Sequence, residues 1–286
     1  MMYSIVLAIA LLPVFILGWW IYRKDSARPE PLKLLFRAFL YGVGSTFVTV
    51  VIVSFLSMFG LVVREPGSFA DAASLSLFGA ALPEESAKLL MLWLFLRKNK
   101  YYDEYLDGIV YAACVGLGFA GAENILYVLQ SEDWLLTGVI RGLTAVPAHF
   151  AMACAMGYFY SKRHWGDRST LTAVCILAVP ILIHWTWDAL AFSEGVYPGL
   201  SVAIDIALLV LIYILYQRTM KRIASMQKLD EARFTPPPVP GTVAPPQSQP
   251  SGMPLPPPPP TQTTQTGTPL PPPFSGNNDN NNNPQV

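Results

Sequence analysis

The chain has 286 residues, of which 52% are hydrophobic and 13% are charged, and its formal net charge is zero. Soluble domains average about 25% charged residues, so this composition excludes an ordinary globular enzyme and indicates a polytopic membrane protein. The zero net charge also argues against a nucleic-acid partner, which would favour a basic surface.

Seven apolar segments are each long enough to cross about 30 Å of hydrocarbon as a helix. They cover residues 4–22, 38–63, 72–96, 108–131, 134–160, 170–193 and 195–217. The sequence therefore predicts an all-α fold, a membrane helix bundle of about seven transmembrane helices. The first segment lacks a basic n-region and a small-residue cleavage site, so we expect a retained anchor.

Lysine and arginine residues are distributed unevenly among the connecting segments. Sixteen of the nineteen follow the first, third, fifth or seventh apolar segment, and only Arg64 lies on the opposite side. Basic residues accumulate on the cytoplasmic side of membrane proteins. We therefore expect a multi-pass protein of the cell membrane, with the N-terminus outside and the C-terminus in the cytoplasm.

The composition changes near residue 231, where a segment rich in Pro, Thr, Gln and Asn begins. Such a segment has too few large apolar residues to fold alone and favours extended polyproline II conformations. The predicted domains are a seven-span membrane domain at residues 1–230 and a disordered cytoplasmic tail at residues 231–286.

Ionisable residues lie inside four consecutive predicted spans, where a charge costs about 3 kcal/mol even on lenient scales and usually marks a functional site. They are Glu84, Glu85 and Lys88 in the third span, Glu123 in the fourth, His149 in the fifth, and His184 with Asp188 in the sixth. Glu84, His149 and His184 fall near the midpoints of their spans. The sequence therefore predicts that these three residues meet at one depth.

The spacing of these residues predicts specific contacts. Glu84 and Lys88 lie four residues apart, on one helix face, and can form an ion pair. Glu85 is rotated by about 100° from Glu84, so the two carboxylates can have different roles. Pro83 removes a backbone hydrogen bond just before them, which loosens the helix or starts a new one.

Two further pairings concern the fifth and sixth spans. His184 and Asp188 lie one turn apart, so the carboxylate either fixes the ring tautomer or faces a substrate or ion together with it. Arg141 either extends toward the membrane surface or pairs with an acid such as Glu123.

A carboxylate held in low dielectric beside histidines is a suitable general base for water, which predicts hydrolysis with imidazole or carboxylic-acid donors at the oxyanion. A divalent metal such as zinc is the open alternative, although this mechanism requires none. The predicted ligands would be Glu85, Glu123, His149 and His184. Against a metal, the chain has no His-Glu-x-x-His motif, and the ligands would come from four helices.

Four motifs occur in order on consecutive predicted spans: Glu84-Glu85-x-x-Lys88, Phe119-x-x-x-Glu123, His149 and His184-x-x-x-Asp188. Over about residues 37–193 they resemble the PrsW family of intramembrane proteases, which is related to the CAAX prenyl proteases and bacteriocin-processing enzymes. The resemblance implies proteolysis of membrane-tethered protein substrates, in some members an anti-sigma factor in a signalling cascade.

The same resemblance implies a role for each motif residue. Glu84 would be the water-activating base, supported by Glu85 and Lys88, and His184 with Asp188 would bind the oxyanion. Glu123 stands where the prenyl-protease relatives have histidine. His149 would supply the function of that histidine.

Two other functional classes fit parts of the pattern. Proton- or ion-coupled transporters also place Glu, His, Asp and Lys inside the membrane, but they favour paired inverted repeats, which the seven segments do not show. A catalytically silent scaffold that displays its tail would tolerate changes at the buried polar residues. The motif order favours the protease.

Overall fold

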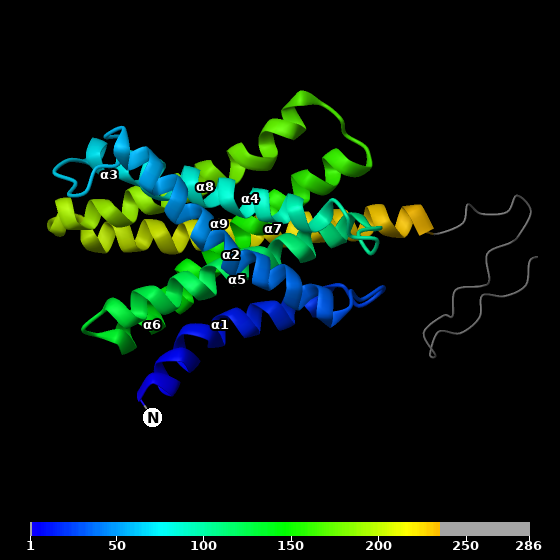
Figure 1. The fold of residues 1–286 in the computed structure, drawn as a ribbon, viewed down its shortest axis with the longest axis horizontal. Coiled ribbons are helices and arrows are strands. Elements are labelled where there is room, and N and C mark those ends of the chain that lie inside the picture. The colour runs from blue at the N-terminus through cyan, green and yellow to red at the C-terminus, as the bar shows by residue number, and fades with distance from the viewer. Residues whose placement is uncertain (1, 235–286) are drawn as a thin grey trace, which may run out of the picture. The chain divides into compact units, whose positions relative to one another are not determined.

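The computed structural model describes residues 2–234; the predicted tail from residue 235 onward lies outside the described residues. The elements are α1 (Met2–Lys24), α2 (Leu32–Met58), α3 (Phe69–Leu75), the π-helical turn η1 (Ser76–Ala81), α4 (Leu82–Leu96), α5 (Tyr105–Gln130), α6 (Trp134–Leu143), α7 (Ala145–Trp165), α8 (Thr170–Val196), the 3₁₀ turn η2 (Pro198–Leu200) and α9 (Ser201–Phe234). Residues 2–234 contain no β-strand, which confirms the predicted all-α fold (Figure 1).

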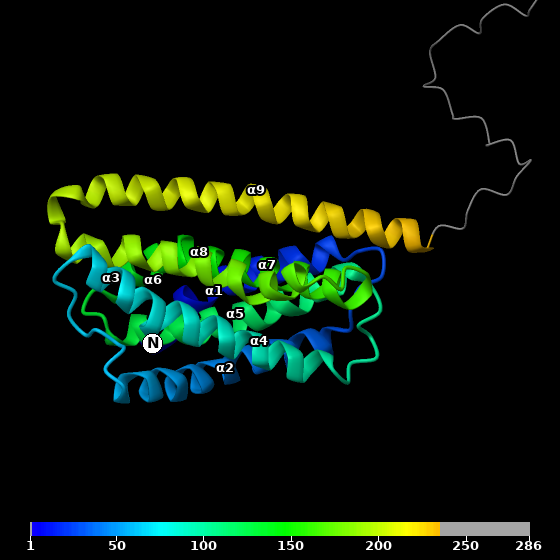
Figure 2. The same cartoon turned by 90° about the horizontal axis from the view of Figure 1, so that it is seen from above.

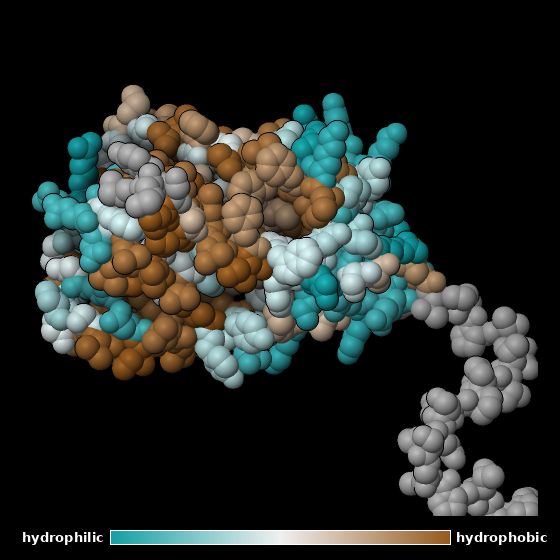
Figure 3. Space-filling view, turned by 90° about the horizontal axis from the view of Figure 1, so that it is seen from below, coloured by the Kyte–Doolittle hydropathy of each residue, from teal (hydrophilic) through white to brown (hydrophobic). Residues whose placement is uncertain are grey.

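Six described segments are long and apolar enough to cross a membrane: Leu7–Lys24, Leu32–Met58, Tyr105–Gln130, Trp134–Trp165, Thr170–Val196 and Pro198–Phe234. The remaining predicted span, residues 72–96, is formed by α3, η1 and α4, which follow one another without a break. These observations confirm a multi-pass membrane bundle of about seven crossings. Figure 3 shows the corresponding surface, a wide hydrophobic area between more hydrophilic ends.

Helix α5 is the centre of the bundle. Within its spanning segment 78% of the residues are buried, against 17% in α1 and α2 and 22% in α8 (Figure 2). The outer helices instead carry large exposed apolar side chains, among them Met58, Leu171 and Val202. In a membrane these side chains face lipid, so a polar site must be sought around α5.

Two glycines bring α2 into close contact with α5. A Cβ atom on Gly42 would overlap the backbone oxygen of Val115, and one on Gly118 would overlap the backbone oxygen of Phe39. Small residues at such crossings allow close backbone approach, which seals the interior of the bundle from lipid.

The predicted loosening of the third span takes the form of a π-helical turn. Pro83 has no N–H, so the α-helical hydrogen bond to the carbonyl of Gly79 cannot form there. The backbone adopts π geometry over Ser76–Ala81 and returns to α geometry at Leu82. Turns of this kind are frequent at functional sites, and this one directly precedes Glu84 and Glu85.

The predicted span over residues 134–160 is present, but its helix is interrupted. The chain forms α6 and α7, which are separated at Thr144, where φ is −121° and ψ is −69°. Pro147 contributes to the break because it cannot donate to the carbonyl of Leu143. The break leaves Arg141 in the last turn of α6.

Two predicted boundaries also differ from the structure. Helix α2 begins at Leu32 and ends at Met58, earlier than predicted, and α9 continues to Phe234, past the predicted domain boundary at residue 230. Helix α9 continues beyond the end of its apolar run, because Ile223 and Met226 are buried in the main core.

Candidate active site

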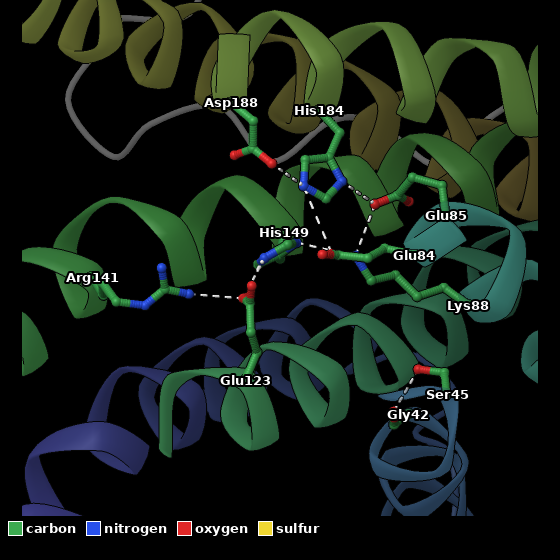
Figure 4. Close-up of polar contacts among 10 residues, drawn as sticks. All are labelled: Gly42, Ser45, Glu84, Glu85, Lys88, Glu123, Arg141, His149, His184 and Asp188. Carbon is green, nitrogen blue, oxygen red and sulfur yellow. Dashed lines mark hydrogen bonds and ion pairs between the residues drawn. The ribbon is translucent and has the colours of Figure 1, made fainter. Parts of the chain in front are cut away.

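A cavity of about 840 Å³ lies among α4 to α9. Its acidic and basic lining residues are Glu84, Glu123, Arg141, His149, His184, Asp188, Glu194 and Asp205. Five of the seven residues predicted as catalytic therefore line one space, although they come from four different helical segments (Figure 4). The other two, Glu85 and Lys88, are fully buried behind the wall of the cavity.

Lys88 connects the two adjacent glutamates of α4. Its Nζ lies 2.8 Å from Glu85 Oε1 and 3.4 Å from Glu84 Oε2. The predicted pair of Lys88 with Glu84 is present, but the shorter contact is with Glu85. Glu84 lines the cavity and Glu85 does not, so the two carboxylates are indeed placed differently. The Lys88 ammonium also lies 3.9 Å from the centre of the Phe119 ring, which adds a cation–π contact.

His184 is held from both sides by carboxylates. Its Nδ1 lies 3.0 Å from Glu85 Oε1, and its Nε2 lies 3.1 Å from Asp188 Oδ2 and 3.7 Å from Glu84 Oε2. Each ring nitrogen that carries a proton therefore has a carboxylate to accept it. The hydroxyl of Ser76 donates to the carbonyl of Trp185 at 2.8 Å and so holds α8, the helix that carries His184, in place.

His149 is held by one cation and one anion. Its Nδ1 lies 3.1 Å from the Nζ of Lys88, and its Nε2 lies 2.9 Å from Glu123 Oε2. An ammonium can only donate, so Nδ1 is the acceptor and Nε2 carries the proton that is donated to Glu123. The His149 and His184 rings are 5.1 Å apart and nearly perpendicular, which confirms that the two residues meet.

Glu123 is anchored from the side opposite His149. Arg141 Nη2 donates to Glu123 Oε2 at 2.8 Å, and its Nε donates to the side chain of Asn124 at 3.2 Å. Of the two predicted roles for Arg141, the structure shows the pairing with Glu123. Asn124, which the sequence did not single out, donates in turn to the carbonyl of Ala10 at 2.8 Å and so ties this network to α1.

Glu84, His149 and His184 offer one oxygen and two nitrogen atoms within 4.8 Å of one another, a donor set of the kind that zinc enzymes use. This group contains Glu84, whereas the ligand set expected from the sequence contained Glu85 and Glu123. Those two acids are engaged elsewhere, Glu85 with Lys88 and Glu123 with Arg141.

The hydrogen-bond pattern of His149 does not fit that of a metal ligand. A ligating imidazole needs a free lone pair on one nitrogen. In His149 the Nδ1 lone pair accepts from Lys88, and Nε2 donates to Glu123. A cation at this position would also lie beside the Lys88 ammonium. The residues present pair mainly with one another, although Glu85 Oε2 has no hydrogen-bond partner among the described residues.

Membrane-crossing helices that surround an internal cavity with paired acids and histidines are typical of intramembrane hydrolases, and ion-coupled transporters also place such residues inside the membrane. Comparison with known proteins identifies the type. The family model described as "PrsW family intramembrane metalloprotease" matches residues 30–216, and the chain therefore belongs to the PrsW family. The predicted resemblance is confirmed, and so is the prediction that the protein is a peptidase.

The relatives support this assignment over most of their length. Protease PrsW of Clostridioides difficile (strain 630) is 32% identical over 191 residues, which cover 65% of this chain and 79% of the relative. Protease PrsW of Geobacillus kaustophilus is 34% identical over 187 residues, which cover 63% and 78%. Protease PrsW of Bacillus subtilis (strain 168) is 30% identical over 182 residues, which cover 62% and 79%. No solved structure matches the chain.

Proposed function

We propose that Glu84 is the base that activates water to cleave peptide bonds of membrane-anchored proteins. The observation that carries this proposal is the position of Glu84 relative to Glu85. Both acids contact Lys88, but Glu84 lines the cavity, beside His184 on the same wall, and Glu85 is enclosed. A base must reach the water whose proton it takes, and Glu84 meets this geometric requirement.

In the proposed reaction Glu84 takes a proton from water, and the hydroxide oxygen bonds to the carbonyl carbon. The negative charge that develops on the carbonyl oxygen needs donors already in place. In this proposal Glu85 fixes the His184 ring through Nδ1, and Nε2, which faces Asp188 at 3.1 Å, would donate to the carbonyl oxygen in place of Asp188. When the C–N bond breaks, Glu84 returns its proton to the leaving amine, and two peptides are released.

The other members of the network are positioning residues. Glu85 and Lys88 hold Glu84 and His184 in place from behind the cavity wall. Glu123, itself paired with Arg141, holds His149 close to Glu84 and His184 as a second polar group for the substrate. The sequence resemblance extends the proposal to regulated signalling, with an anti-sigma factor as the substrate class.

The mechanism requires no metal ion, so chelation tests it. We expect the purified protein in detergent to cleave a membrane-anchored substrate at an unchanged rate after metal removal that elemental analysis has verified. If activity disappears and returns with about one equivalent of Zn²⁺, the glutamate mechanism is wrong. Glu84, His149 and His184 would then be metal ligands, and the ion would polarise the carbonyl and acidify water.

The proposed substrate route is an apolar groove of about 430 Å³ between α1, α7 and α9. Ala148 and Leu209 line both this groove and the active-site cavity, so the two spaces adjoin. The groove walls are formed by apolar and aromatic side chains such as Trp20 and Tyr213. A hydrophobic membrane segment of the substrate fits such walls, and its end would reach Glu84.

Filling the junction of groove and cavity tests this route. Leu209 is 60% exposed, so Leu209→Trp is expected to fold. We expect about 10-fold slower cleavage of a membrane-anchored substrate, which corresponds to about 1.4 kcal/mol, and an unchanged rate with a soluble peptide of the same cleavage sequence. Val210→Trp, at the next exposed position and outside the groove, is the matched control. Equal rates for both variants would exclude the groove as the route.

The proposed orientation places the N-terminus outside and the tail in the cytoplasm. It rests on the sixteen basic residues that follow alternate spans, against Arg64 on the other side. Reporter fusions after Leu96 and Tyr160 are expected to read the cytoplasm, and an outside signal at either position would overturn this orientation.

A further inference from the structure

A second group of acidic residues lies at the end of the bundle where the α1–α2 and α4–α5 connections meet, away from the α6 and α8–α9 end (Figure 2). Asp25 and Glu30 come from the first connection, Asp103 and Glu104 from the second, and Asp107 from the first turn of α5. None of these residues takes part in the proposed mechanism. We refer to these five residues as the acidic cluster.

The carboxylates form two overlapping triads that share Asp107. Asp25, Glu104 and Asp107 offer oxygen atoms within 4.8 Å of one another, and so do Glu30, Asp103 and Asp107. Calcium binds carboxylate oxygens at about 2.3–2.6 Å, so two oxygens on one ion lie at most about 5 Å apart. The spacing of each triad is therefore that of oxygen ligands around a single hard cation.

One oxygen atom of the shared residue is left without a partner. Asp107 is completely buried. Its Oδ2 accepts from the backbone N–H groups of Asp103 at 2.9 Å and Glu104 at 2.7 Å. Its Oδ1 has no hydrogen-bond partner among the described residues. A buried carboxylate oxygen is costly to leave unpaired, so this atom needs a ligand that the protein itself does not provide.

The positive charge near the cluster compensates only part of its negative charge. Arg28 Nε lies 3.3 Å from Glu104 Oε1, but the arginine side chain is half exposed, and Arg233 donates to the backbone carbonyl of Asp103 instead of a carboxylate. Carboxylates gathered in a buried position repel one another and lose hydration, so the cluster needs positive charge from solution.

A path to the cluster is present. A cavity of about 410 Å³ borders Asp25 and Glu104 and is also lined by Arg28 and Asp230. An ion can therefore reach Asp25 and Glu104, two members of the first triad, without unfolding of the bundle. The hydroxyl of Tyr111 donates to Glu30 and so occupies one of its carboxylate oxygens.

We propose that the acidic cluster binds a divalent cation that prefers oxygen ligands, Ca²⁺ or Mg²⁺, with Asp107 as the central ligand. Oxygen-only donor sets select these ions over zinc. The ion would join the α1–α2 and α4–α5 connections to the start of α5, the helix around which the bundle is built. It is a structural site at a distance from Glu84, and it does not depend on the proposed catalytic mechanism.

Thermal unfolding of the full-length protein in detergent tests the proposal. After treatment with EDTA, CaCl₂ or MgCl₂ is titrated at constant ionic strength. We expect a saturable rise in Tm of about 5 °C when the ion reaches about 100 times its Kd, and about one ion bound per chain in equilibrium dialysis. The effect must persist in Glu84→Gln, because the ion is not bound in the active-site cavity.

Two variants and one control assign the ion to the cluster. Asp107→Asn is expected to weaken binding at least 10-fold. Asp103→Asn is expected to do the same, and because the Asp103 side chain is exposed, this second variant tests ligation without a change in the buried core. Glu132→Gln, an exposed acid at the other end of the bundle, should bind as the wild type does. If neither salt raises Tm, or if both Asp variants respond as the wild type does, protons alone neutralise the cluster and the proposal is wrong.

Discussion

Replacing Glu84 by glutamine is expected to slow peptide-bond cleavage by about 100-fold or more while the protein remains inserted and folded. Glutamine keeps the size of the side chain, and its carbonyl oxygen can still accept from Lys88. It cannot take a proton from water. The expected change is therefore in kcat, measured by product formation with purified protein in detergent.

A matched control separates loss of the base from loss of charge in the cavity. Glu194→Gln changes a carboxylate that lines the same cavity but contacts neither histidine. The kcat of this variant is expected to stay within about threefold of the wild-type value, since substitutions away from buried polar networks usually have small effects. A Glu84→Gln protein that cleaves as fast as Glu194→Gln would show that Glu84 is not the base.

Replacing His184 by alanine is expected to lower kcat by about 100- to 1,000-fold. One preorganised donor to an oxyanion contributes about 3–4 kcal/mol to the stability of the transition state. The substitution also leaves Glu85 and Asp188 without their shared partner. The loss of these two ion pairs is expected to reduce stability as well. The kcat must therefore be measured at a temperature at which a thermal unfolding curve shows the variant to be folded.

The chain supplies a control histidine for this experiment. His164 is exposed at the end of α7, outside the cavity, and makes an edge-to-face contact with Trp165. His164→Ala is expected to retain full activity. If folded His184→Ala also retains activity, His184 does not stabilise the oxyanion, and His149 becomes the donor to test.

Much of the candidate site could be predicted because charge inside an apolar span is so costly that few positions carry it. That rule alone selected Glu84, Lys88, Glu123, His149 and His184. The matching depths of Glu84 and the two histidines further predicted their meeting, and their donor atoms do lie within 4.8 Å. Local spacing was enough for contacts within one helix, such as that of His184 with Asp188.

Contacts between helices could not be predicted, because the sequence does not give the rotation of one helix against another. The contact of Lys88 Nζ with His149 Nδ1 is one example, and it occupies a ring nitrogen that a metal ion would need. The π-helical turn before Pro83 and the break at Thr144 also depend on packing. Both alter the direction in which the following side chains point.

The acidic cluster escaped the sequence interpretation for a different reason. Asp25, Glu30 and Asp103 lie just outside the apolar segments, where charged residues are ordinary and cost little. Only the fold brings them against Asp107 at the start of α5. Burial of acids from separate connecting segments is therefore a signal that only the structure reveals.

The central claim is that the buried acids and histidines form one peptidase active site in which Glu84 activates water. Product analysis in H₂¹⁸O tests it most directly, with the protein and a membrane-anchored substrate reconstituted together in liposomes. The account predicts two products from the wild type, with one ¹⁸O atom in the new carboxylate, and none from Glu84→Gln. Labelled products formed by Glu84→Gln at the wild-type rate would contradict it, as would a wild type that forms no product but takes up a solute along a pH gradient.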